Sequence, residues 1–340
     1  MKRLFRLLVL IPVFLASCIK DPGLTYYTIS GFTQGTTYTM TYAVKDSLNL
    51  KYAVDSILHD FDLSLSSWEE NSVLSRLNRN ETDSADQKVQ TTFSVAKEVN
   101  EISGGAFDIT VYPLVNAWGF GPGKKAEISP EVIDSILEFV GMSKVRIVDG
   151  RLIKDDPRIS LDVNAIAQGY SVDVVAEYFE SIGIENYLVE IGGEIRTLGL
   201  NPRHRTWEIG VDRPEFGNYF PGEDMQVVLA LSGKSMASSG NYRKYYEEEG
   251  IKYWHSIDPV MGYPARGDVL SSTVIMNSCI EADAYATAIM ILGLEKSKLM
   301  IEKVRGLEAY IIYGDEDGLF QVYYTDGFKP YIEREYYKTQ

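Results

Sequence analysis

The sequence predicts an α+β fold. Strand-like and helical patterns succeed one another irregularly along the 340 residues. Hydrophobic residues make up 45% of the chain, enough to fill a substantial core. No short-period repeat, low-complexity tract or long linker divides the sequence. We therefore expect a single folded domain over residues 26–335.

The elements expected in the first half follow from local pattern. Thr, Tyr and Ile favour strands, and apolar residues that recur every three to four positions favour helices. In chain order we expect two strands within 26–42, helices at 50–63 and 91–102 around an irregular polar stretch at 65–80, a helix at 131–140 capped around Ser129-Pro130, a hairpin at 145–153 turning at Asp149-Gly150, and a strand at 159–162.

The second half is expected to begin with an amphipathic helix at 163–182, ended by Gly183. Its buried stripe would consist of Ile166, Tyr170, Val174, Tyr178 and Ile182. The elements expected after it are strands at 187–191, 207–211 and 226–231, a hairpin through 247–250, a strand at 251–257, a short apolar strand, a helix at 281–292 ended by Gly293, and a hairpin over 309–332.

The chain is strongly acidic. Its net charge is −15 at pH 7, and loss of the first 17 residues, with Lys2, Arg3 and Arg6, lowers it to −18. A surface this acidic fits poorly with nucleic acid. It also disfavours an anionic substrate unless a metal ion lies between protein and substrate. The composition therefore argues against a nucleic-acid partner.

The N-terminus has the pattern of a secretory signal. Residues 1–6 are basic, and residues 7–15 form an apolar run too short to span a bilayer permanently. LASC at 15–18 follows and matches the lipobox of bacterial lipoproteins, in which the cysteine is acylated. We expect a signal peptide at 1–17, a palmitate-bearing Cys18 on a tether at 18–25, and a membrane-anchored protein facing the periplasm. An ordinary cleaved signal with an incidental cysteine is the alternative.

Asp283 and Thr287 lie four residues apart in the helix expected at 281–292, so both project from one face. A carboxylate and a hydroxyl on an otherwise apolar helix suggest oxygen ligands for a hard cation such as Mg²⁺. The spacing also permits a structural explanation. Asp283 would then complement the helix dipole in the first turn, and Thr287 would bond the backbone one turn earlier.

His255 is a candidate for proton transfer. The chain has three histidines, of which His59 falls in a helical segment and His204 in an arginine-rich loop. His255 lies near the end of the strand expected at 251–257, three residues before Asp258, where a loop begins. A side chain with a pKa of about 6.5 suits acid–base chemistry at neutral pH. A hydrogen-bonded histidine at a strand end is the plain alternative.

Other acids and glycines stand where a ligand could bind. Asp108 follows a Gly-Gly turn among aromatic residues, a setting that could cradle a planar ring or could be ordinary core. Asp162 precedes the helix at 163–182, where it could bond a ligand or cap the helix. Gly192-Gly193 could let the backbone approach a ligand closely or form a plain turn.

The order of these motifs resembles the ApbE family, the FAD:protein FMN transferases. The matching pieces are QGTTY at 34–38, SVLSRLN at 72–78, GAFDIT at 105–110 with WGF at 118–120, LDVNAIAQGY at 161–170, Gly192-Gly193, SGNY at 239–242, HSIDP at 255–259 and ADAYAT at 282–287. The pieces at 161–170, 255–259 and 282–287 are the most specific. The resemblance implies a compact α+β unit related to the T-fold, with mixed or antiparallel sheets flanked by helices.

The same resemblance implies roles for individual residues. Asp283, Thr287 and the backbone oxygen of Ala165 would bind Mg²⁺, and His255 would be the catalytic base. FAD would be contacted by Gln34, Trp68, Ala106, Phe107, Asp108, Asp162, Gln168 and Ile257. Such enzymes split the FAD pyrophosphate, pass FMN to a Thr or Ser hydroxyl of a partner protein and release AMP. Typical acceptors are subunits of membrane redox complexes.

Several positions depart from the family pattern. Gln34 stands where methionine is commoner, Gln168 where lysine is common, Asn241 where aspartate is common, and Val260-Met261 replaces Arg-Thr. The missing lysine removes a positive charge that could touch the phosphates. Two other functions stay open at this point. One is a Mg²⁺-dependent FAD pyrophosphatase that makes FMN and AMP with water, and the other is a lipoprotein that binds FAD without chemistry.

Overall fold

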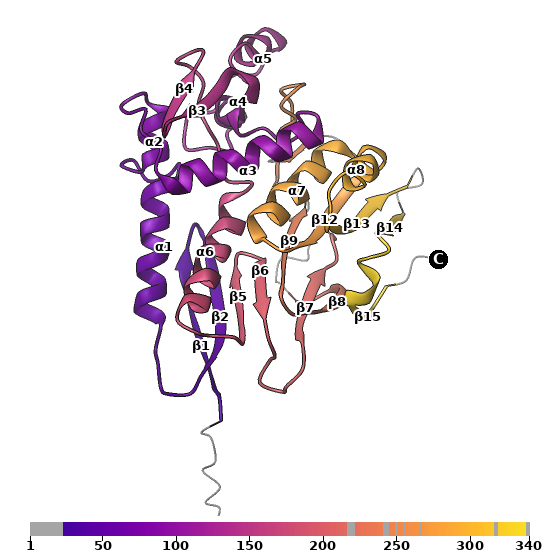
Figure 1. Cartoon of the computed structure of the whole chain (residues 1–340). Coiled ribbons are helices and arrows are strands. Elements are labelled where there is room, and N and C mark those ends of the chain that lie inside the picture. The colour runs from indigo at the N-terminus through magenta and orange to yellow at the C-terminus, as the bar shows by residue number, and fades with distance from the viewer. Residues whose placement is uncertain are drawn as a thin grey trace, which may run out of the picture.

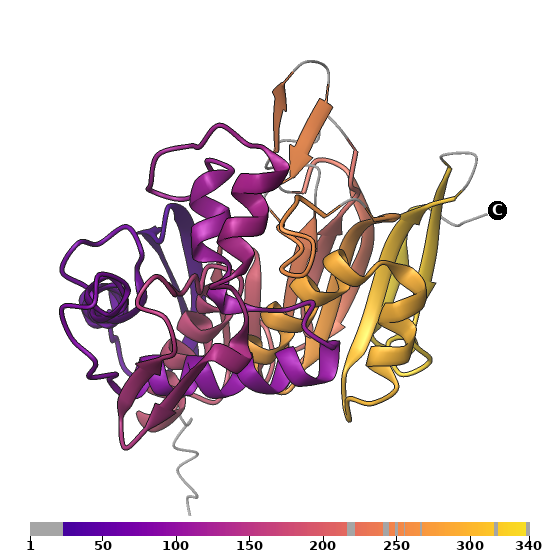
Figure 2. The same ribbon diagram turned by 90° about the horizontal axis from the view of Figure 1, so that it is seen from above.

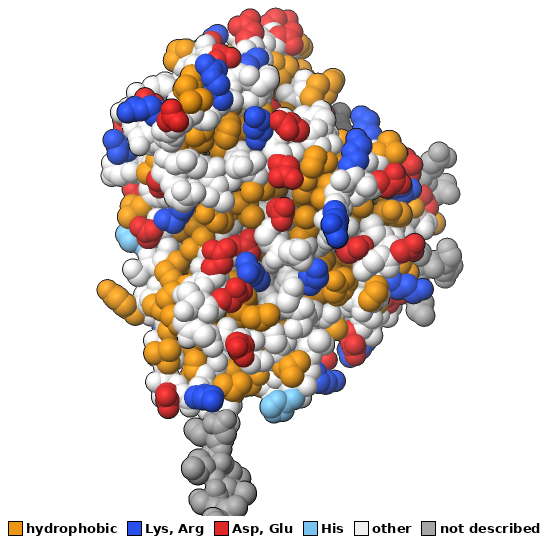
Figure 3. All heavy atoms as spheres, in the orientation of Figure 1, with side chains coloured by type: hydrophobic (Ala, Val, Ile, Leu, Met, Phe, Trp, Pro, Cys, Tyr) orange, Lys and Arg blue, Asp and Glu red, His pale blue; other side chains and the backbone are white. Residues whose placement is uncertain are grey.

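The computed structural model describes residues 23–215, 222–240, 245–248, 251–254, 256–265, 267–315 and 319–337. Its secondary structure confirms the expected α+β class. Every strand pairing within the described residues is antiparallel. On the face shown in Figure 3, acidic and basic side chains are interspersed.

The helices lie mainly on one side of a large sheet (Figures 1 and 2). In the described part of the chain the α-helices are α1 (Lys51–Leu65), α2 (Val73–Asn78), α3 (Gln87–Ser103), α4 (Tyr112–Ala117), α5 (Pro130–Leu137), α6 (Ala167–Ser181), α7 (Cys279–Leu292) and α8 (Leu294–Ile301). Short 3-10 turns occur at η1 (Ile109–Val111), η2 (Met142–Lys144) and η3 (Lys329–Tyr331).

The large sheet has eight strands in the order β1-β2-β5-β6-β9-β12-β13-β14. A smaller sheet has the order β15-β8-β7, and β3-β4 and β10-β11 are separate hairpins. The strands are β1 (Thr25–Thr33), β2 (Thr36–Val44), β3 (Val145–Val148), β4 (Arg151–Lys154), β5 (Tyr187–Ile191), β6 (Glu194–Leu198), β7 (Trp207–Asp212), β8 (Met225–Leu231), β9 (Lys234–Gly240), β10 (Tyr245–Glu248), β11 (Ile251–Trp254), β12 (Val269–Met276), β13 (Glu308–Gly314), β14 (Phe320–Tyr324) and β15 (Ile332–Glu335).

The large sheet separates two apolar cores. Along β13, Ala309 and Ile311 belong to the core shared with α7 and α3, whereas Tyr310 and Ile312 belong to the core shared with the small sheet. Side chains of neighbouring residues in a strand point to opposite faces. The helical layer and the sheet β15-β8-β7 therefore cover opposite faces of the large sheet.

Helix α7 lies at the centre of the helical layer. It packs against α3 and α6 on its sides and against β9 and β12 beneath. Ten of its 14 residues are buried, as expected for a helix that is apolar on nearly every side. Any polar side chain on α7 is consequently held in a fixed, largely dry position.

A smaller apolar cluster fixes the loop at 256–265 against α4 and α5. Ile257 packs with Leu114, Trp118 and Ile133, and the Trp118 indole N–H donates a 2.9 Å hydrogen bond to the carbonyl of Gly262. Gly262 has φ +74°, and a Cβ there would lie 2.4 Å from a methyl of Ile133. Only glycine fits this close approach.

Most expected elements are confirmed. They include the hairpin β1-β2, helices α1, α3, α5, α6 and α7, the hairpin β3-β4, and strands β5, β7, β8, β12 and β13. The Ser129 hydroxyl caps α5 by accepting a hydrogen bond from the Val132 N–H. Asp149 and Gly150 both have positive φ at the β3-β4 turn, as that turn chemistry requires.

Three expectations about elements are wrong. The stretch 65–80 contains α2, which Ser72 caps through the Ser75 N–H. Residues 159–162 form no strand. The Asn78 side-chain amide donates to the Leu161 carbonyl at 2.8 Å and accepts from the Leu161 N–H at 2.7 Å, so neither backbone group is available to a strand partner. The strand expected at 251–257 ends at Trp254 as β11.

The buried stripe expected for α6 is also wrong. Ile182 is 43% exposed, and Tyr170, Val174 and Tyr178 are only partly buried. The fully buried face instead includes Gly169, Val172, Asp173, Val175, Ala176 and Phe179. The reason is that α6 lies between α7 and the strands β5 and β6, so its small and polar residues are enclosed too.

Candidate active site

Asp283 is a buried acid on α7 that faces the start of α6. It is the fifth residue of α7, only 6% exposed, and its carboxylate accepts a 3.0 Å hydrogen bond from the Gly169 N–H. Burial raises the pKa of Asp283 to about 7, and the Gly169 hydrogen bond opposes that shift. The position lies beyond the first turn of α7, so the dipole explanation for this acid does not apply.

Gly169 is the residue that lets the two helices meet. A Cβ at this position would lie 2.3 Å from the Cys279 carbonyl oxygen and 2.7 Å from the Asp283 Cβ. No larger residue fits without moving a backbone. The glycine that follows Gln168 in the sequence is the available signal for this contact.

Thr287 lies one turn along α7 from Asp283 and is half-buried. Its hydroxyl is 3.3 Å from the Ser239 hydroxyl, which lies on β9 near the end of that strand. The contact is with another element, and this favours a functional placement of Thr287 over a bond to its own helix backbone. Ser239 was recognised only as part of a motif, and the structure adds it to the candidate site.

The residues around Asp283 fit a hard divalent cation. Asp283 and Thr287 offer a carboxylate and a hydroxyl oxygen, and Ala165 lies in the turn that leads into α6, whose Gly169 binds Asp283. Within the described residues, no three His, Cys, Asp or Glu side chains gather as a metal-binding group. A cation here would depend on mixed oxygen donors, the kind that Mg²⁺ accepts and Zn²⁺ does not favour.

Gln34 and Gln168 lie close to this junction. The Ser171 hydroxyl donates to the Gln168 carbonyl at 2.8 Å and lies 3.3 Å from Gln34 Oε1. Gln34 sits at a turn with φ +50°, and its buried amide nitrogen has no hydrogen-bond partner of ordinary geometry, although Asp62 is near enough to interact. A buried donor without a well-placed partner can be satisfied by a bound polar ligand.

The Gly192-Gly193 turn approaches the same residues. A Cβ on Gly192 would lie 2.4 Å from Gln168 Nε2, and Gly192 has φ +65°. Because Gly192 has no side chain, the Gln168 side chain can lie directly against the backbone of this turn. Gln168 offers a neutral amide in that place.

Asp108 and Asp162 are buried acids of a different kind. Asp108 accepts hydrogen bonds from the Thr110 N–H at 2.7 Å, the Thr110 hydroxyl at 2.5 Å and the Met142 N–H at 2.9 Å. Asp162 accepts a 2.8 Å bond from the Asn164 N–H, so it stabilises its own turn and does not cap α6, whose N-cap is Ile166. Burial raises the pKa of both carboxyls.

The remaining candidate residues differ in accessibility. Ala106 and Phe107 are 7% and 2% exposed, and Phe107 is part of the main core. Ile257 is buried against Trp118, whereas Trp68 is 65% exposed. His255 and Asn241 lie outside the described residues, as does Cys18. Of the described aromatic candidates, Trp68 has a ring that a flat ligand could reach.

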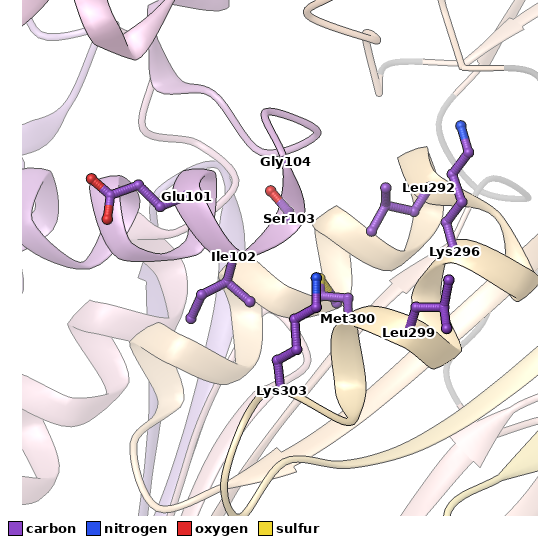
Figure 4. Close-up of a pocket in the computed structure, with 9 residues that line it drawn as sticks. All are labelled: Glu101, Ile102, Ser103, Gly104, Leu292, Lys296, Leu299, Met300 and Lys303. Carbon is purple, nitrogen blue, oxygen red and sulfur yellow. The ribbon is translucent and has the colours of Figure 1, made fainter.

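Two surface cavities lie apart from Asp283. One, of about 350 Å³, is lined by Phe32, Thr33, Lys51, Asp55, Leu58, His59 and Asp62, beside Gln34. The other, of about 250 Å³, lies between the end of α3 and α8; the lysines Lys296 and Lys303 flank it (Figure 4). The second contains none of the predicted site residues.

The fold is that of flavin transferases. A solved structure described as “Flavin Transferase ApbE from Vibrio cholerae” superposes with a TM-score of 0.82 at 34% identity, covering 91% of this chain and all of that one. Among curated relatives, the FAD:protein FMN transferase of Vibrio cholerae is 36% identical over 332 residues, 95% of this chain and 97% of that protein. The Haemophilus influenzae enzyme of the same name is 34% identical and covers 94% of each chain.

The chain belongs to the ApbE family. The family model matches residues 34–311, which contain every described candidate residue. The resemblance inferred from the order of motifs is thereby confirmed, and so is the expected fold.

Proposed function

We propose that this chain, a FAD:protein FMN transferase like its relatives, carries out the transfer at the α6–α7 junction. The single observation behind this placement is the hydrogen bond from the Gly169 N–H, in the first turn of α6, to Asp283, which lies one turn from Thr287 on α7. Backbone N–H groups at a helix start favour phosphate oxygens. FAD brings two linked phosphates to be accommodated there.

Asp283 and Thr287, with the Ala165 carbonyl, are proposed to hold Mg²⁺. Bound there, the ion would neutralise phosphate charge and act as a Lewis acid at phosphorus. A bound cation would also let a chain of net charge −15 bind an anionic substrate that it should otherwise repel. Support comes from the donor set: one buried carboxylate with a single backbone hydrogen bond, and one hydroxyl a helical turn away.

FAD is proposed to contact Gln34, Trp68, Gln168 and the segments around Asp108, Asp162 and Ile257. Gln34 contributes a buried amide nitrogen that lacks an ordinary partner, and Trp68 contributes an exposed ring. Because the carboxylates of Asp108 and Asp162 already accept hydrogen bonds, contact there is expected through backbone groups. The buried side chains of Phe107 and Ile257 would shape the site from behind.

The reaction forms one bond and breaks one. The acceptor Thr or Ser oxygen bonds to the phosphorus of the FMN half, and the anhydride bond to the AMP half breaks, so that AMP leaves with the electron pair. The acceptor hydroxyl loses its proton to a base. His255 is proposed as that base because it matches the family's position and because imidazole titrates near neutral pH.

The acceptor is proposed to be a subunit of a membrane redox complex, and the enzyme is proposed to be anchored beside it. LASC at 15–18 supports acylation of Cys18, which lies outside the described residues. In the part of the chain that the structure describes, no helix is both long and apolar enough to cross a bilayer. Conversion of Cys18 to Ala should move the protein from the membrane fraction to the soluble fraction; unchanged membrane association would contradict the anchor.

The function is tested by mixing the purified chain with FAD, Mg²⁺ and an acceptor domain. Covalent flavin fluorescence of the acceptor band, lost when its Thr is changed to Val, is the expected result. Free FMN with an unlabelled acceptor would indicate a pyrophosphatase instead, and unchanged FAD would indicate binding alone. His255→Ala should still bind FAD but lose transfer. Covalent labelling of the acceptor by that variant would show that His255 is not the base.

A further inference from the structure

Helices α6 and α7 hold each other through two carboxylates, only one of which belongs to the proposed cation site. Asp283 of α7 accepts a hydrogen bond from the Gly169 N–H in the first turn of α6. In return, Asp173 of α6 accepts hydrogen bonds from the Cys279 N–H at 2.8 Å and the Ile280 N–H at 2.9 Å, the first two residues of α7. Each helix start is therefore satisfied by an acid from the other helix.

The spacing explains why the two contacts occur together. Gly169 and Asp173 are four residues apart on α6, and Cys279 and Asp283 are four residues apart on α7, so each pair lies on one helical face. Gly169 meets Asp283 and Asp173 meets Cys279, so the two helices run antiparallel along this contact. A shift of one contact must move the other.

Asp173 is itself fixed from the sheet. It is 3% exposed, and Arg196 of β6 donates a 2.9 Å hydrogen bond to its second oxygen. The same guanidinium reaches Glu180 at 3.0 Å, and the Tyr187 hydroxyl donates to Glu180 at 2.5 Å. A chain of charged hydrogen bonds thus runs from the strands β5 and β6 to the first turn of α7. At the buried Asp173 end of this chain, the charge-assisted bond from Arg196 holds geometry tightly.

We infer that Asp173 is a positioning residue for the divalent-cation site. By binding the first two N–H groups of α7 it sets where that helix begins, and hence where Asp283 and Thr287 present their oxygens against α6. It acts through α7 and touches neither cation nor FAD. This inference rests on the proposed function, since it needs a cation at Asp283.

The test is Mn²⁺ binding to the whole purified chain without FAD, followed by the electron paramagnetic resonance signal of the free ion. Asp173→Asn keeps the size of the side chain but loses its charge and one acceptor oxygen. We expect the dissociation constant for Mn²⁺ to rise about tenfold, which corresponds to roughly 1.4 kcal/mol. Asp283→Ala should abolish the binding.

A matched control separates positioning from general loss of stability. Phe328→Leu alters the core on the other face of the large sheet, where the ring packs against Tyr310, away from α6 and α7. It should lower the melting temperature yet leave Mn²⁺ affinity within twofold. If Asp173→Asn does not fold, Arg196→Lys is measured in its place; it keeps the charge but loses the forked contact with Asp173 and Glu180, and about threefold weaker binding is expected.

The outcomes distinguish two failures. If Asp283→Ala lacks binding, either wild-type affinity in Asp173→Asn or an equal loss of affinity in Phe328→Leu would overturn the positioning role. Wild-type affinity in Asp283→Ala would overturn the cation site itself, and with it this inference.

Discussion

The α6–α7 junction and the corner around Asp108 both bury a carboxylate, but they use it differently. Asp108 receives three hydrogen bonds, from the Thr110 N–H and hydroxyl and the Met142 N–H, and these join η1 to η2. Asp283 is about as well buried yet receives one, from Gly169. The Asp108 carboxylate is saturated by hydrogen bonds from the protein, whereas the Asp283 carboxylate keeps lone pairs that a ligand can use.

The difference teaches that burial alone does not identify a functional acid. Burial raises the pKa of both groups. A saturated carboxylate contributes to stability, because removing it leaves several buried donors unpaired. An unsaturated one costs free energy in the fold and is retained where a ligand makes use of it. Mutations at the two positions should therefore have opposite signatures.

The largest effect is expected for Asp283→Ala. Loss of the carboxylate removes the proposed cation, which is worth several kcal/mol of transition-state stabilisation, so flavin transfer should fall by about 10³-fold or more. The melting temperature without Mg²⁺ should stay unchanged or rise, because a poorly solvated charge is gone. Covalent labelling of the acceptor and thermal unfolding measure the two quantities. Full labelling by this variant would show that Asp283 is not required for transfer and does not differ in this respect from Asp108.

Asp108→Ala should show the reverse pattern. The N–H groups of Thr110 and Met142 and the Thr110 hydroxyl lose their acceptor in a buried place, at roughly 1–3 kcal/mol for each unsatisfied group. We expect a loss of about 3 kcal/mol in the free energy of unfolding, read from urea melts, with transfer per folded molecule within tenfold of wild type at low temperature. Asp108→Asn, which keeps one acceptor, should be milder. An unchanged urea midpoint would contradict the structural role.

The sequence reveals the helix that carries Asp283 and Thr287 but not which acids are available. Spacing places both residues on one face, and α7 confirms this. Whether a carboxylate is saturated depends on residues far away in the chain, such as Met142 for Asp108 and Gly169 for Asp283. These contacts form only on folding. No local pattern encodes them.

The errors in the predicted fold have the same origin. The 159–162 segment has a strand-like composition, but the Asn78 amide captures its backbone at Leu161. The buried stripe predicted for α6 assumes that only one face of the helix is buried, whereas the side that carries Asp173 is enclosed by α7. No strand is predicted at 234–240, where three serines occur, yet β9 runs within the large sheet, where its neighbours β6 and β12 decide its conformation. Tertiary context overrides local propensity in each case.

The third prediction concerns the pH dependence of stability and Mg²⁺ binding at Asp283. The pKa of Asp283 lies near 7, above its ordinary value of 3.8, so the folded state holds this proton more tightly than the unfolded state does. The contribution of Asp283 to metal-free stability is then greatest below about pH 4 and is lost as the pH rises towards 7. A cation binds the ionised form, so the Mg²⁺ dissociation constant should fall roughly tenfold per pH unit up to pH 7 and then level off.

Melting curves with and without Mg²⁺ between pH 5 and pH 8 measure this dependence. The stabilisation by Mg²⁺ should grow with pH and become constant above pH 7. Asp283→Asn, which has no proton to lose, should show no Mg²⁺-dependent rise over this range. A constant Mg²⁺ effect from pH 5 to pH 8 in the wild type would contradict the raised pKa.

The smallest effect is expected at Trp68, which belongs to neither buried acid and can act only on the ligand. The ring is 65% exposed, so Trp68→Ala should change the free energy of unfolding by no more than about 0.5 kcal/mol. If the ring stacks on FAD as proposed, its loss should weaken FAD binding by about 1 kcal/mol, roughly fivefold, because aromatic pairs contribute on that scale. Tyr52→Ala on α1, where the ring is 87% exposed, is the matched control and should leave FAD affinity unchanged. Flavin fluorescence titration of the two variants gives the answer, and equal affinities would remove Trp68 from the site while leaving Asp283 in it.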